Sequence, residues 1–226
     1  MSDYLLVHGA FNSGWVWDAV TGQLQAGGHR AHVVEQLPSG GTEPAALGDL
    51  SADVDHVRGV LETTAEPVVL VGHSYGGMVI TEFADHPKVR HSVYLTALWP
   101  KRGQSVLNQL GDVLPNVFVW REDGAMEMAD DFELAWKSFC PDLARDQGHM
   151  VLSRFVLQSA TSYCAPSMAP ERMHPATYVI ATQESANSVV AQEAWSANAD
   201  HVVRISAGHM VQLSRPRELA EVLGRI

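Results

Sequence analysis

The sequence predicts an α/β protein with a mostly parallel, doubly wound sheet of about six strands and a helical cap inserted over it. Short apolar runs alternate with segments whose apolar residues recur at helical spacing. Between residues 98 and 173 this alternation lapses into a stretch rich in Trp, Phe, Met and acidic residues, too long for a simple loop. We therefore expect a core formed by residues 1–97 and 174–226, with residues 98–173 as the cap.

The expected strands are short, continuous apolar runs, as is typical of parallel strands buried on both faces. They are Tyr4–Val7, Ala31–Val34, Val68–Val71, Val93–Thr96, Tyr178–Ile180 and Val202–Ile205. Helical spacing marks one helix on each side of the second strand and another at the C-terminus. The residues with this spacing are Trp17, Val20 and Leu24, then Val54, Val57 and Leu61, then Leu219, Val222, Leu223 and Ile226.

Composition and charge narrow the range of partners. The formal net charge of -11, without a local Lys/Arg cluster, disfavours nucleic acid. No apolar run approaches the roughly 20 residues that span a bilayer, and Met1–Asp3 has no basic leader character, so we expect a cytoplasmic protein without a membrane partner. Cys140 and Cys164 are expected to be reduced and to have no catalytic role. The sequence leaves homodimer formation open.

The segment Gly72-His73-Ser74-Tyr75-Gly76 carries the main chemical signal. A serine hydroxyl becomes a useful nucleophile only with a base in reach and a geometry that exposes its oxygen. Glycines two residues before and after Ser74 permit a sharp turn, and Gly77 lets the following helix pack closely. Because a strand precedes this pattern and a helix follows it, we predict that Ser74 is a nucleophile on a strand-to-helix turn.

The remaining catalytic groups follow from chain order. A tetrahedral intermediate needs two N–H donors, and the candidates are Tyr75, after the nucleophile, and Ala10, after the first strand. The base should follow the last strand, where His209 lies in a loop of small residues. The acid should follow the strand before it, which points to Glu184, with Glu193 on the next helix as the rival. We interpret His8 and His73 as packing residues beside these positions.

These residues resemble one known group, the α/β-hydrolases that include plant methyl esterases, salicylate-binding esterases and hydroxynitrile lyases, with bacterial relatives. The likeness covers nearly the whole chain, only loosely in the cap, and rests on Leu6–Ala10 with Trp15–Trp17, Gly72–Gly77, Tyr94–Ala97 and Gly208–Leu213. It implies the α/β-hydrolase fold and an aspartate where this chain has Glu184. The lyases carry threonine at the position of Gly9 and lysine at that of Met210, so both positions are esterase-like here.

We therefore expect a carboxylesterase-like serine hydrolase that cleaves a small to medium hydrophobic or aromatic ester through an acyl-enzyme, without a cofactor or metal. Gly9, Met210 and Trp136 are the candidate substrate-binding residues. Trp136 belongs to an apolar set in the cap, which comprises Trp120, Phe132, Trp136, Phe139, Met150 and Phe155. The alternatives are a thioesterase, lactonase or cyclase of secondary metabolism, a hydroxynitrile lyase, and a non-catalytic ligand-binding protein on the same fold.

Overall fold

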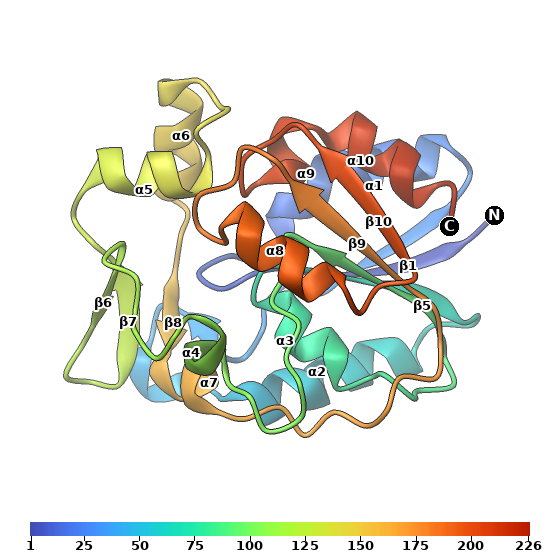
Figure 1. Ribbon diagram of the computed structural model, residues 1–226, viewed down its shortest axis with the longest axis horizontal. Coiled ribbons are helices and arrows are strands. Elements are labelled where there is room, and N and C mark those ends of the chain that lie inside the picture. The colour runs from blue at the N-terminus through green and yellow to red at the C-terminus, as the bar shows by residue number, and fades with distance from the viewer.

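The structure is a computed structural model that describes residues 1–226. At its centre lies a six-stranded parallel sheet with the strand order β10-β9-β5-β4-β1-β2 (Figure 1). Its strands are β1 (Asp3–Val7), β2 (Arg30–Val33), β4 (Val68–His73), β5 (Val89–Leu95), β9 (Ala176–Ala181) and β10 (His201–Ile205). The parallel sheet and its six expected strands are confirmed.

Helices cover both faces of this sheet (Figure 1). One face packs against α1 (Asp18–Ala26), α9 (Val211–Ser214) and α10 (Pro216–Leu223), and the other against α2 (Leu50–Glu62), α3 (Gly76–Thr81) and α8 (Val189–Ser196). Side chains of β1 alternate between the two apolar layers, because successive residues of a strand point to opposite faces: Leu5 and Val7 face α2 and α3, whereas Tyr4 and Leu6 face α1 and α10. The doubly wound arrangement is therefore confirmed.

The cap contains both helices and strands. Its elements are α4 (Val106–Gln109), β6 (Phe118–Trp120), β7 (Ala125–Met128), α5 (Phe132–Phe139), α6 (Arg145–Leu152), β8 (Leu157–Ser159) and α7 (Ala160–Cys164). The three strands join β3 (Gly40–Gly41), which follows β2, in an antiparallel sheet ordered β3-β8-β7-β6. The sequence predicts a mostly helical cap without this sheet, because strands of three or four residues give no readable alternation.

The cap lies over the carboxyl ends of the parallel strands, on the side away from both termini (Figure 1). Backbone hydrogen bonds join it to the core, among them one that Val156 N–H donates to Phe11 O and one that Met210 N–H donates to Phe139 O. The longest helix of the chain, α2, has 13 residues. None of the helices combines the length and apolar character needed to cross a bilayer.

Backbone strain concentrates at the same end of the sheet. Phe11, Ser74 and Thr96 have φ values of 61°, 51° and 44°, in the region that side-chain-bearing residues rarely adopt. Each lies at or shortly after the carboxyl end of β1, β4 or β5. Such conformations persist only where the surrounding structure enforces them, and they cluster at functional sites.

Candidate active site

Ser74 occupies a sharp turn between β4 and α3. Its N–H donates to Leu95 O (3.1 Å), and its carbonyl accepts from Gly77 N (3.0 Å) and Leu98 N (3.1 Å). These bonds to the end of β5 and the residues after it enforce the positive φ of Ser74. The sequence places Ser74 at a strand-to-helix turn, and the structure has it there.

Two glycines of the turn leave no space for a side chain. A Cβ on Gly76 would lie 2.8 Å from the carbonyl oxygens of Val7 and His8, and one on Gly77 would lie 2.1 Å from Leu98 O. Real Cβ atoms do not approach backbone that closely, so a side chain would push the turn away from its neighbours. Glycine is therefore needed here for close packing of the Ser74 turn against the ends of β1 and β5.

His209 and Glu184 form a buried pair on the loops that follow β10 and β9. Nδ1 of His209 lies 2.6 Å from Oε2 of Glu184, and their side chains are 3% and 0% exposed. A carboxylate can only accept, so Nδ1 carries the proton of this bond and Nε2 is left with a free lone pair. That tautomer is the one required of a general base acting through Nε2.

Glu184 is fixed by its own loop as well as by His209. Its other oxygen, Oε1, accepts backbone N–H groups of Ala186 (2.6 Å) and Asn187 (2.9 Å). The rival carboxylate, Glu193, lies on α8 and pairs with Arg204 at the surface, at 2.8 Å. The structure thus brings Glu184 to His209 and keeps Glu193 away from it.

Ser74 and His209 line one small cavity under the cap, with a volume of about 30 Å³. Its other walls are mainly apolar, formed by Leu98, Val106, Leu110, Pro115, Phe118, Phe139, Tyr163, Ala186 and Asn187. No hydrogen bond joins Ser74 Oγ to His209, and such catalytic bonds often tighten only with substrate. A larger surface hollow of about 540 Å³, beside Trp99 and Arg172, contains neither residue, so size alone does not locate the site.

The two expected oxyanion donors flank Ser74. The backbone N–H groups of Ala10 and Tyr75 donate to no acceptor in the protein, whereas buried N–H groups are normally paired. Gly9, just before Ala10, approaches Ser74 so closely that a Cβ on Gly9 would lie 3.0 Å from Ser74 Cβ. The turn after β1 therefore abuts the nucleophile turn.

Two buried histidines hold these turns in place. His73 Nε2 donates to His209 O at 3.0 Å, and His8 Nε2 accepts from Leu37 N at 3.1 Å while its Nδ1 donates to Gly9 O at 2.8 Å. Burial lowers the pKa of His8 to about 4 and that of His73 well below its ordinary value. Both rings are therefore neutral at pH 7 and hold the neighbouring backbone through hydrogen bonds. This agrees with their interpretation from the sequence as packing residues.

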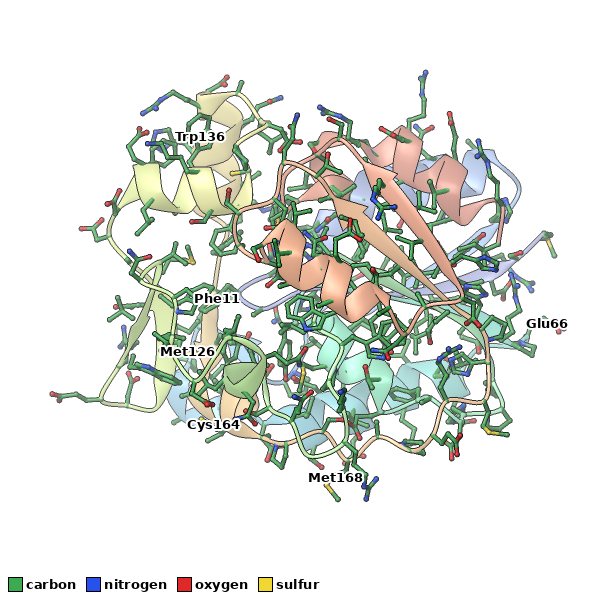
Figure 2. All side chains as sticks on the ribbon, viewed as in Figure 1. Phe11, Glu66, Met126, Trp136, Cys164 and Met168 are labelled. Atoms are coloured by element: carbon green, nitrogen blue, oxygen red, sulfur yellow. The ribbon has the colours of Figure 1, made fainter.

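The expected substrate-binding residues fall in different places. Gly9 lies against Ser74, while Met210 is fully buried in the apolar layer formed with α1 and α10. Trp136 lies outside the cavity: its Nε1 donates to Leu143 O, and Figure 2 shows its side chain between α5 and α6. Of the apolar cap set, only Phe139 lines the cavity.

Sequence reasoning missed Phe118, Tyr163 and Asn187, which also line the cavity. Phe118 is on β6 and Tyr163 on α7, elements too short to be predicted. Asn187 follows Glu184 closely, and its Nδ2 donates to Thr96 O at 2.7 Å. Its place directly after the acid loop was the only available signal.

Comparison with known proteins agrees with this geometry. A sequence model of the alpha/beta hydrolase family matches residues 4–222. The chain therefore belongs to the alpha/beta hydrolase family. It is 30% identical, over the full length of both proteins, to a carbendazim hydrolyzing esterase of Nocardioides sp. (strain SG-4G).

Solved structures share the fold. A pyrethroid hydrolase from Sphingobium faniae superposes with a TM-score of 0.83 at 23% identity, covering 99% of this chain and 96% of that one. A methylesterase from Arabidopsis gives a TM-score of 0.84 at 18% identity, covering 100% and 98%. The expected resemblance to plant methyl esterases and bacterial relatives is confirmed at the level of family and fold.

Proposed function

We propose that the chain is a serine carboxylic-ester hydrolase with Ser74, His209 and Glu184 as its triad. One observation carries the proposal: the buried 2.6 Å hydrogen bond from His209 Nδ1 to Glu184, on the cavity that Ser74 also lines. The family membership and the 30% identity to an esterase support it. Ala10 and Tyr75 N–H groups complete the proposed machinery as oxyanion donors.

The proposed reaction has two steps of the same kind. Ser74 Oγ attacks the ester carbonyl while His209 Nε2 takes its proton, and the resulting oxyanion is held by the N–H groups of Ala10 and Tyr75. Collapse expels the alcohol, which receives the proton from His209 and leaves an acyl-Ser74. Water then attacks this acyl group with His209 as base, and the second collapse releases the acid and returns the proton to Ser74. No cofactor or metal takes part.

The cavity favours a short or flat acyl group. Its volume is only about 30 Å³, and most of its walls are apolar. We therefore expect the acyl part of a small to medium hydrophobic or aromatic ester to bind between Phe118, Phe139 and Tyr163, with larger esters requiring movement of the cap. Met210 places no positive charge beside His209, which disfavours a hydroxynitrile lyase.

A direct test measures hydrolysis of p-nitrophenyl esters from acetate to octanoate, and of carbendazim, by wild type and Ser74→Ala. The expected result is turnover that is fastest with short acyl chains and lost in Ser74→Ala. Labelling by a fluorophosphonate should require Ser74 in the same way. If neither turnover nor labelling depends on Ser74, the chain is a ligand-binding protein on this fold, and the esterase proposal fails.

A further inference from the structure

The two proposed oxyanion donors belong to separate turns that must aim at the same point. Ala10 follows β1, and Tyr75 follows β4. An error of about 1 Å in such an arrangement can cost roughly 100-fold in rate. Positioning of the two turns relative to each other therefore matters as much as the donors themselves.

The side chain of Tyr75 ties its turn to α2. Its hydroxyl donates to Oδ2 of Asp53 at 2.7 Å, and the other carboxylate oxygen accepts from Ser39 N at 2.8 Å. Tyr75, Asp53 and Ser39 are all fully buried. Burial raises the pKa of Asp53 to about 6 and that of Tyr75 well above its ordinary range. Burying a carboxyl is unfavourable unless hydrogen bonds compensate, and here Tyr75 and Ser39 supply them.

A glutamine of the cap ties the other turn. Gln158, on β8 and 2% exposed, accepts from Phe11 N at 3.2 Å through Oε1. Phe11 directly follows Ala10 and has a positive φ. The amide nitrogen of Gln158 donates to Ser39 Oγ and Ser162 Oγ, both at 2.8 Å. Gln158 thus holds the backbone beside Ala10 and also contacts the residue that holds Asp53.

These bonds form one continuous buried chain from the Ala10 turn to the Tyr75 turn. It runs from Phe11 N–H through Gln158, Ser39 and Asp53 to the hydroxyl of Tyr75. We propose that Gln158, Asp53 and the Tyr75 hydroxyl are positioning residues that set the spacing of the two oxyanion donors. This inference rests on the proposed esterase function. Because Gln158 belongs to the cap, seating of the cap also aligns the oxyanion hole.

The test compares two tyrosines that are equally buried. Tyr75→Phe removes only the hydroxyl and keeps the backbone donor. Tyr94→Phe is the matched control, because the Tyr94 hydroxyl is also buried and hydrogen-bonded, to Thr81 at 3.0 Å, but lies outside the cavity. Each variant is assayed for kcat and KM on p-nitrophenyl acetate, for inhibition by a trifluoromethyl ketone, and for thermal unfolding. The ketone adds to Ser74 as an oxyanion, so its affinity reports alignment of the donors.

Tyr75→Phe should lower kcat by about 10- to 100-fold at nearly unchanged KM, with an equal loss of trifluoromethyl ketone affinity. Tyr94→Phe should leave these quantities at wild-type values. A drop in melting temperature alone, similar in the two variants, would mean that the Tyr75 hydroxyl only stabilises the fold and would overturn the proposal. Failure of the esterase proposal is recognised separately, by wild-type turnover that does not depend on Ser74, and it would overturn this inference too.

Two substitutions of Gln158 provide a second, independent test. Gln158→Glu keeps an acceptor for Phe11 N–H, and the serine hydroxyls can turn to donate to the new carboxyl. Gln158→Met is similar in length but has no such acceptor. We expect the Met variant to lose kcat and ketone affinity together, and the Glu variant to recover at least half of the loss on a logarithmic scale. Equal values for both would contradict a positioning role for Gln158.

Discussion

The floor and the roof of the cavity are built in different ways. The floor consists of the turns after the parallel strands: Ser74 and His209 line the cavity there, and Ala10, Tyr75 and Glu184 belong to the same turns. The roof consists of Phe118, Phe139 and Tyr163 from the cap. Backbone packing that leaves no room for a Cβ on Gly76 or Gly77, positive φ values and buried hydrogen bonds fix the floor. Aromatic packing makes the roof, with Phe118 stacked at 4.7 Å on Phe11 and 5.8 Å from Phe139.

Because of this difference, we expect the floor to govern the rate of the proposed reaction and the roof to govern which esters bind. Hydrogen bonds and close backbone contacts are directional and tolerate little displacement, so the floor can hold reacting groups in register. Apolar contacts are not directional, and volume-conserving changes among them usually cost little. Substitutions in the floor should therefore abolish turnover or folding, whereas substitutions in the roof should change which esters are accepted.

The largest effect is expected for Glu184→Gln. The amide oxygen can still accept from Ala186 and Asn187, but its NH₂ group would face His209 Nδ1 and favour the wrong tautomer of the ring. We expect kcat to fall by about 10⁴-fold with little change in KM. Glu193→Gln, at a surface ion pair, is the control and should retain wild-type kcat. Comparable activity of the two variants would remove Glu184 from the triad.

Close packing of the floor predicts a large loss of stability for Gly77→Ala. The new Cβ would lie 2.1 Å from Leu98 O, and the turn would have to move. We expect the free energy of unfolding to fall by about 3 kcal/mol, from urea titration. Gly22→Ala, in α1 with nothing within 4 Å of the new Cβ, should instead be neutral or stabilising by up to about 1 kcal/mol. A stable Gly77→Ala would show that the turn is less constrained than its contacts imply.

Acid should lower the stability of the protein because of His8, which is buried beside the floor of the cavity. Its pKa is about 4 in the folded protein and near 6.5 when unfolded, so between these values the unfolded chain binds more protons. Stability is therefore lost as the pH falls from about 6.5 to 4, and for this fully buried ring the loss is about 3 kcal/mol. Urea titrations at pH 7 and pH 4 should show a smaller loss in His8→Gln, whose amide can still bond to both neighbours. If His8→Gln lost as much stability between pH 7 and pH 4 as the wild type, groups other than His8 would be responsible for the acid sensitivity.

The smallest effect is expected in the roof. Phe118→Leu should enlarge the cavity and raise kcat/KM for p-nitrophenyl hexanoate relative to acetate by about 10-fold, the scale of one or two methylenes in an apolar pocket. Trp120→Leu, on the same strand but 43% exposed, should leave this ratio unchanged. A Phe118→Leu variant that lost turnover of every ester equally would break the separation between floor and roof.

Local patterns sufficed for much of this protein. The six strands of the parallel sheet, the turn at Ser74 and the loop at His209 are all marked by runs of neighbouring residues. Apolar periodicity reports burial within a single element, and glycine spacing reports a sharp turn. The same logic failed in the cap, where Phe118–Trp120 and Leu157–Ser159 are too short to carry a period, and where Leu157–Ser159 pairs with strands far earlier along the chain.

The sequence by itself determined the alternating sheet and the places of Ser74 and His209 on the turns that follow its strands, because burial and turn geometry are encoded locally. Tertiary structure alone decided which carboxylate meets His209, since Glu184 and Glu193 offer the same chemistry nine positions apart. It also placed Trp136 outside the cavity and joined Phe11, Ser39, Asp53, Tyr75 and Gln158 in one buried chain. Contacts between residues far apart along the chain leave no periodic trace, so only the packed fold defines them.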